Sequence, residues 1–154
     1  MALDGPVELA DGDLDRFFRQ LDRLEQAETL AGREFVLRRM LQPPLKVLTE
    51  RWLVWTFDPS FRYPLALPPL RSVRRQDEGV GLVMAWRVLE RVLVDMRTGA
   101  LGLPDVQKKL IYLLEHAPGR IRGWLWRLLN HMLVAGLDRD AVDGLVPGLL
   151  AREA

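Results

Sequence analysis

Cysteine is absent from the 154-residue sequence. Its absence excludes a disulfide scaffold, a zinc site built on thiolates and a thiol nucleophile. Serine and histidine are scarce: the serines are Ser60 and Ser72, and the histidines are His116 and His131. Neither serine lies in a nucleophile motif, and the histidines lack the HxxxH or ExxH spacing of a metal site. We therefore expect no catalytic residue, no metal and no cofactor, and we predict that the protein is not an enzyme.

Long apolar runs and an excess of one charge are also missing. No uninterrupted apolar stretch reaches the length of a membrane-spanning helix. The first residues, MALDGPVELADGD, are acidic and lack the apolar core of a secretory signal. The 22 basic and 21 acidic side chains give a net charge of +1, which provides no overall attraction to nucleic acid or to a membrane. We expect a cytoplasmic protein with no membrane partner.

The hydrophobic content, 49% of the residues, is that of a globular domain, and a chain of this length can bury one sizeable core. Residues 1–12 are rich in glycine, proline and aspartate, so we predict a flexible N-terminal tail before a single helical domain over residues 13–151. Apolar residues recur at helical spacing in that domain. The predicted helices cover 13–41 with a break or bend at Gly32, 45–57, 79–97, 104–117, 120–136 and a short segment after Asp138. The predicted fold is all-α, a compact bundle of five or six helices.

The predicted helix over 120–136 is apolar around most of its circumference. Its polar arc is narrow and consists of Arg120, Gly123, Arg127, Asn130 and His131. A helix of this kind is enclosed by neighbours, so we predict that it is the central helix of the bundle. The predicted helix over 79–97 is amphipathic instead. Its side facing water is predicted to carry Arg87, Glu90, Arg91 and Asp95.

Residues 58–78 contain four prolines and cannot form a long helix. The same stretch carries Phe61, Tyr63 and several leucines, so it is too apolar for a solvated linker. Long irregular loops inside compact domains are usually functional or disordered. We predict a proline-rich strap that lies over the bundle, or a segment that contacts a partner.

Tryptophan and arginine side chains, which dominate the binding energy of protein interfaces, are plentiful in this sequence, whereas catalytic groups are missing. The leading functional hypothesis is therefore a non-catalytic protein–protein interaction module. It would act as an adaptor or assembly subunit of a larger complex, or as a homodimer. The candidate interface residues are Trp55, Phe61, Tyr63, Trp126 and Arg127.

The alternative is a nucleic-acid-backbone-binding protein, such as a small helical subunit of a ribonucleoprotein complex. Residues 61–98 carry seven arginines against four acids, and arginines near aromatic residues can hold a phosphate backbone. The candidate residues for this function are Arg71, Arg74, Arg75, Arg87 and Arg91. A weaker alternative is a protein that binds a small apolar ligand, which a cavity beside Asn130 and His131 would favour.

Overall fold

The structure is a computed structural model that describes residues 5–10, 12–61, 65–75 and 79–150. Within these ranges the chain forms seven α-helices, two short 3-10 turns and no strand. The elements are α1 (Asp13–Gln26), α2 (Leu30–Met40), α3 (Lys46–Phe57), η1 (Pro59–Phe61), η2 (Leu70–Ser72), α4 (Leu82–Thr98), α5 (Leu103–His116), α6 (Gly119–Leu129) and α7 (Arg139–Leu145). The all-α prediction is confirmed, and the number of helices is higher than the predicted five or six.

The additional helix arises because the predicted helix over 13–41 is two helices. The chain leaves α1 at Ala27 and begins α2 after Thr29, whose Oγ1 accepts a hydrogen bond from the Gly32 N–H at 3.0 Å. This side-chain cap starts a new helix and places Gly32 in its first turn. The predicted break at Gly32 is therefore wrong, since the break precedes that residue.

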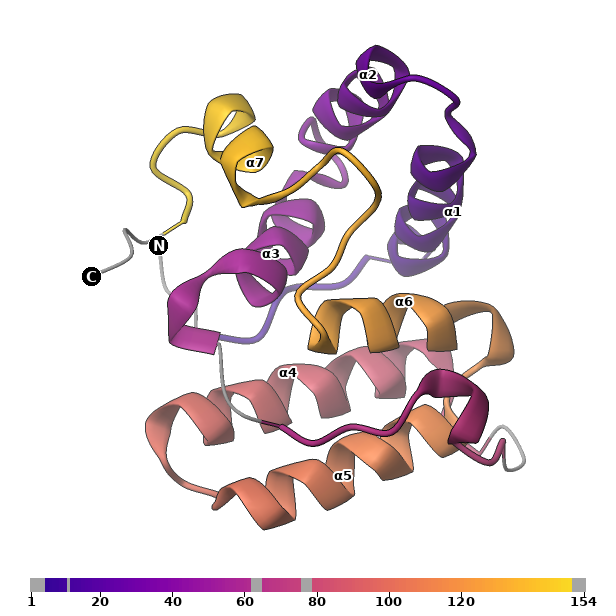
Figure 1. The fold of residues 1–154 in the computed structure, drawn as a ribbon, viewed down its shortest axis with the longest axis vertical. Helices are drawn as coiled ribbons and strands as arrows, with labels where there is room; N and C mark the ends of the chain where they lie inside the picture. Colours follow the sequence, from indigo (N-terminus) through magenta and orange to yellow (C-terminus); the bar gives the residue numbers. More distant parts are fainter. Residues whose placement is uncertain (1–4, 11, 62–64, 76–78, 151–154) are drawn as a thin grey trace.

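The most enclosed helix is α3, in which every residue from Arg51 to Phe57 is buried. Its indole rings join a cluster of aromatic side chains in which neighbouring ring centroids lie 5.0–6.1 Å apart. The members of this cluster are Phe17, Phe18, Trp52, Trp55 and Trp86. In Figure 1, α3 lies between the layer formed by α4, α5 and α6 and the helices α2 and α7. The centre of the core is thus α3, with α6 packed against it.

The predicted helix over 120–136 is shorter in the structure, because α6 ends at Leu129. His131 adopts a left-handed backbone conformation (φ 60°), which reverses the chain after the helix. Residues 131–137 then form an irregular turn with one isolated bridge between Val134 and Leu137. The enclosure that we predicted holds for the helical part, since no residue of α6 after Arg120 is exposed.

The 65–75 part of the proline-rich strap is packed on the bundle, where it crosses α4, α5 and α6 (Figure 1). Its backbone is held by side chains of the helices below it. The Trp126 Nε1–H donates to the Pro68 carbonyl at 3.1 Å, and the Ala66 N–H donates to Gln107 Oε1 at 3.1 Å. These bonds satisfy backbone groups of the strap at positions that belong to neither a helix nor a sheet.

Residues 5–10, the part of the predicted flexible tail that the structure describes, pack against α3 and α4. Val7 is 3% exposed and its N–H donates to Glu90 at 2.9 Å. Arg51, which is buried in α3, donates to the Gly5 carbonyl at 2.8 Å. The core therefore extends to residues that precede the predicted boundary at residue 13.

Gly123 offers a test of the assignment of α6. A Cβ at this position, in the middle of α6, would meet no atom within 4 Å. Alanine is favoured over glycine in a helix interior, so Gly123→Ala should raise the free energy of unfolding by about 0.5–1 kcal/mol, measured by urea denaturation.

Gly99→Ala is the matched control for Gly123→Ala. Gly99 also has no atom within 4 Å of a built Cβ, but its φ is +77° at the C-cap of α4. The same added methyl group should lower stability by about 1 kcal/mol there, because L-residues are strained in this conformation. Changes of the same sign at both positions would contradict the assignment.

Candidate interface between helices α4 and α5

Helix α4 has two apolar faces. Its inner face is buried in the core and consists of Ala85, Trp86, Leu89, Leu93 and Met96. A second stripe, Met84, Val88 and Val92, recurs every four residues and faces the neighbouring helix α5. The two helices are joined by the short connection 99–102, and they pack along one another.

The second stripe forms the floor of a hollow of about 580 Å³, which we call the α4–α5 groove. The residues that line it are Met84, Arg87, Val88, Arg91, Val92, Lys108, Lys109 and Tyr112. Four of these eight side chains are cationic and none is acidic. The groove therefore combines an apolar floor with a positively charged edge.

The apolar floor reaches the surface. Met84 is 58% exposed and Tyr112 is 55% exposed. The Tyr112 ring is held in place by the His116 ring, with 4.2 Å between the two centroids. Single exposed apolar side chains are normal, and the distinguishing feature here is that Met84, Val88 and Tyr112 line one hollow. Methionine adapts its shape readily to whatever packs on it.

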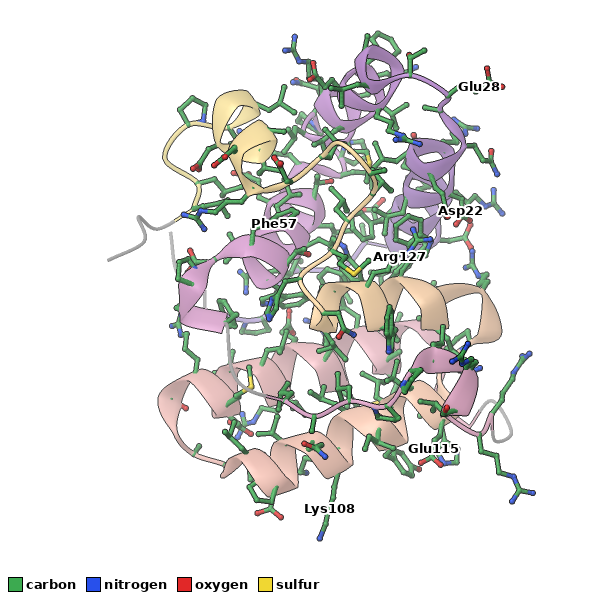
Figure 2. The ribbon with its side chains drawn as sticks, viewed as in Figure 1. Asp22, Glu28, Phe57, Lys108, Glu115 and Arg127 are labelled. Carbon is green, nitrogen blue, oxygen red and sulfur yellow. The ribbon has the colours of Figure 1, made fainter. Side chains whose placement is uncertain are left out.

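The two lysines have no carboxylate partner in the part of the chain that is described. Lys108 and Lys109 are exposed and make no ion pair or hydrogen bond with it, and Figure 2 shows Lys108 extending from α5 away from the body of the molecule. Arg91, in contrast, pairs with Asp95 at 3.3 Å on the same helix. The charge of the α5 edge is consequently available to an external acid.

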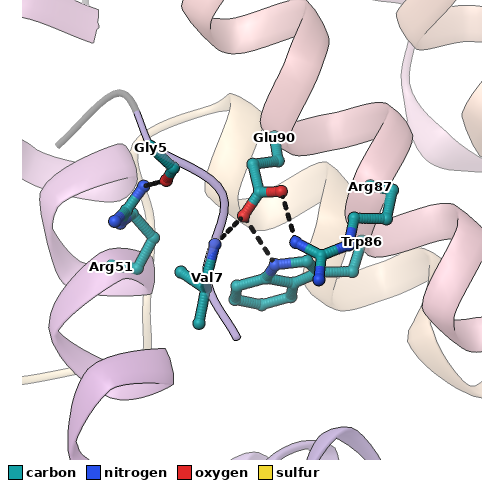
Figure 3. A network of polar contacts seen from close by, with 6 residues as sticks. All are labelled: Gly5, Val7, Arg51, Trp86, Arg87 and Glu90. Carbon is teal, nitrogen blue, oxygen red and sulfur yellow. Dashed lines mark hydrogen bonds and ion pairs between the residues drawn. The ribbon is translucent and has the colours of Figure 1, made fainter. Parts of the chain in front are cut away.

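Arg87 is fixed at the other edge by Glu90, as Figure 3 shows. Its Nη1 donates to Glu90 Oε1 at 2.7 Å, while Oε2 of the same carboxylate accepts the Val7 N–H and the Trp86 Nε1–H, the latter at 3.2 Å. Glu90 is only 5% exposed, so the prediction that it faces water is wrong. A buried carboxylate is tolerated here because three donors surround it.

The four predicted interface residues that the structure describes do not form one surface. Trp55 and Phe61 are core side chains, 1% and 2% exposed, so their burial removes them from any surface that a partner could contact. Tyr63 lies outside the described residues. Trp126 is half-buried beneath the strap, and Arg127 pairs with Glu25 at 2.6 Å and stacks on the Trp124 ring. Figure 2 shows Arg127 between α6 and α1.

The five arginines predicted for nucleic-acid binding fall into two groups. Arg87 and Arg91 line the α4–α5 groove. Arg71, Arg74 and Arg75 are exposed near η2, and none of them lines the groove. The Arg75 guanidinium lies instead against Gly119, where an added Cβ would be 2.5 Å from its Nη2.

Sequence reasoning missed Met84 and Tyr112 as contact residues. The signal for Met84 was present, because residues 84, 88 and 92 repeat at helical spacing beside the buried stripe. Tyr112 had no such signal, because a single exposed aromatic residue beside the buried stripe of an amphipathic helix looks like a core residue in the sequence.

The described residues contain no group of three or more His, Asp and Glu side chains that could hold a metal ion. His116 contacts Tyr112, whereas His131 contacts the Thr56 carbonyl at the end of α3. In the same ranges, each helix is too short or too polar to cross a bilayer. No family model matches the chain, and neither a curated protein nor a solved structure matches it.

The Glu90 network predicts that a small chemical change at this residue lowers the free energy of unfolding substantially. Glu90→Gln keeps the shape of the side chain but replaces one acceptor oxygen with a donor amide among three donors. We expect the free energy of unfolding to fall by about 2 kcal/mol, measured by urea denaturation. Asp95→Asn makes the same chemical change in an exposed pair on the same helix, and should cost less than about 0.5 kcal/mol. An equal decrease in the free energy of unfolding for the two variants would show that the buried network does not stabilise the protein.

Proposed function

We propose that this protein is a non-catalytic protein-binding module, an adaptor or assembly subunit, whose α4–α5 groove takes an acidic amphipathic helix of a partner. The observation that carries the proposal is the apolar floor of Met84, Val88 and Val92 within an edge of four cations and no acid. A partner that matches this surface must present apolar and acidic side chains together.

A helix fits the shape of the groove. Two packed helices leave a furrow between their side-chain ridges, and a third helix can place its own ridge there. Met84 and Val92 are eight residues apart on α4, which corresponds to about 12 Å at the helical rise of 1.5 Å per residue. A partner helix would therefore engage the floor over about two turns, with apolar residues at positions i, i+3 or i+4, and i+7.

The positive edge selects the charge of the partner. Acids that flank the apolar stripe of the partner helix would meet Lys108 and Lys109, which make no ion pair within the described ranges. Such exposed pairs add modest affinity, but they steer the encounter and disfavour basic helices. Binding should consequently weaken as salt screens the charges.

The apolar floor favours a protein partner over nucleic acid. A phosphate backbone would pair with the cations of the groove, but it would leave Met84 and Val88 without an apolar surface against them. The remaining arginines of the nucleic-acid hypothesis, at positions 71, 74 and 75, lie outside the groove and would not extend it.

A designed peptide tests the proposal. An 18-residue helix with leucine at i, i+3, i+4 and i+7 and glutamates beside them is labelled with fluorescein, and its binding is followed by anisotropy at two salt concentrations. We expect saturable binding that weakens at the higher salt. The double variant Lys108→Glu/Lys109→Glu should weaken it at least about tenfold, because it reverses the charge of one edge. Met84→Gln should weaken it at both salt concentrations, because it removes apolar contact.

The double variant Arg38→Glu/Arg39→Glu is the matched control, since it makes the same change of net charge at exposed positions of α2. It should leave the affinity within about twofold. A scrambled peptide of identical composition should bind poorly. The proposal fails if the scrambled peptide binds equally well, if Met84→Gln has no effect, or if a single-stranded oligonucleotide competes for the groove more strongly than the peptide does.

A further inference from the structure

A second cavity, of about 510 Å³, lies on another part of the molecule. We call it the 131–138 cleft, because the turn after α6 forms one wall. Its other sides come from Glu25 of α1, Arg33 of α2, Phe57 of α3 and Arg127 of α6. Its volume is within the range of sites for small organic ligands. None of its lining residues belongs to the α4–α5 groove.

The wall of the cleft is set by an unusual backbone conformation. His131 has φ 60°, a value that side-chain-bearing residues rarely adopt. Its Nδ1 lies 3.0 Å from the Thr56 carbonyl. A carbonyl can only accept, so Nδ1 carries the proton of this bond. The bond anchors the reversal to the end of α3 and directs residues 132–138 back over α1 and α2. Strained residues of this kind gather at ligand sites.

Two acids and two arginines line the cleft, and one ion pair forms among them in the described ranges. Glu25 is paired with Arg127 at 2.6 Å. Asp138 caps α7, where its Oδ1 accepts the Ala141 N–H at 2.9 Å. Arg33 has no acidic partner in the described ranges: Nε donates to the Ala27 carbonyl at 3.1 Å and Nη1 donates to the Ala135 carbonyl at 2.7 Å.

These two bonds fix the Arg33 guanidinium and leave three of its five N–H groups for a ligand. A planar, pre-oriented guanidinium is the group that recognises a carboxylate with two parallel hydrogen bonds. The rest of the lining is mainly apolar. Phe57, Met132 and Val134 supply a surface for the body of a ligand.

We infer that the 131–138 cleft binds a small organic carboxylate, with its anionic group on Arg33 and its apolar body on Phe57 and Met132. This site is separate from the proposed partner groove and requires no chemistry beyond binding. A ligand of this class would stabilise the turn at residues 131–137, because it would contact both the turn and α2.

The probe for the test is 2-naphthoate, and the uncharged 2-naphthamide is its control. Binding is followed by ¹H–¹⁵N chemical shifts of the intact chain. We expect 2-naphthoate to shift the amides of residues 33 and 132–137 with a Kd of about 1 mM, as a ligand of this size allows. The amide analogue should bind at least about tenfold more weakly, since it cannot pair with the guanidinium charge.

Arg33→Gln should reduce the affinity for 2-naphthoate at least about tenfold, whereas Arg39→Gln, an exposed arginine of the same helix outside the cleft, should leave it unchanged. Because Arg33 also holds the Ala135 carbonyl, a second pair of variants leaves Arg33 intact. Met132→Glu should abolish binding by placing a negative charge beside the ligand, and Met132→Gln should weaken it by a smaller factor of about threefold, because it removes apolar contact without adding charge. Equal binding of the two probes, shifts confined to α4 and α5, or unchanged affinity in Met132→Glu would each overturn the inference.

Discussion

The buried carboxylate of Glu90 is the interaction that links the parts of this molecule. It is nearly inaccessible to water, and its two oxygens accept bonds from the N-terminal segment, from an indole of the aromatic core and from a guanidinium at the edge of the groove. A buried charge is costly unless donors surround it, so these partners must stay in place together. The network thereby fixes Val7, Trp86 and Arg87 relative to one another, and with them the core and one edge of the candidate interface.

The groove follows from how the helices are layered. Helix α3 occupies the centre, and α4 turns its buried stripe toward it, so the side of α4 that carries Met84 and Val88 is left facing outward beside α5. The strap covers Trp126 through the Pro68 carbonyl, and it does not contribute to the lining of the groove. Trp126 is therefore covered without a partner, whereas the surface around Met84 and Tyr112 would gain burial from one.

Hydrophobic periodicity was sufficient to predict the fold class and most helix positions, because each helix buries a stripe that the sequence displays. It could not predict which element covers which stripe. Glu90 occurs among other charged residues along α4, and its contact with residues 5–10 arises only from the tertiary fold. The sequence was equally unable to show which residues are covered at the candidate site. Trp55 and Phe61 are of residue types that are common in interfaces, but the aromatic cluster and α4 cover them. The turn after α6 is held by the bond between His131 and the Thr56 carbonyl, a contact 75 residues apart in sequence that no local pattern encodes.

The position of Arg87 has one consequence for regulation. Its guanidinium both lines the groove and donates to the carboxylate that holds Val7. In the proposed complex, an acid of the partner that reached Arg87 would compete with Glu90 for the same cation, and a loosened Glu90 would hold residues 5–10 less firmly. By thermodynamic reciprocity, detaching this N-terminal stretch would then change the affinity of the groove by the same factor. Under the proposed function, the Arg87–Glu90 contact would couple the N-terminal segment to the neighbouring groove.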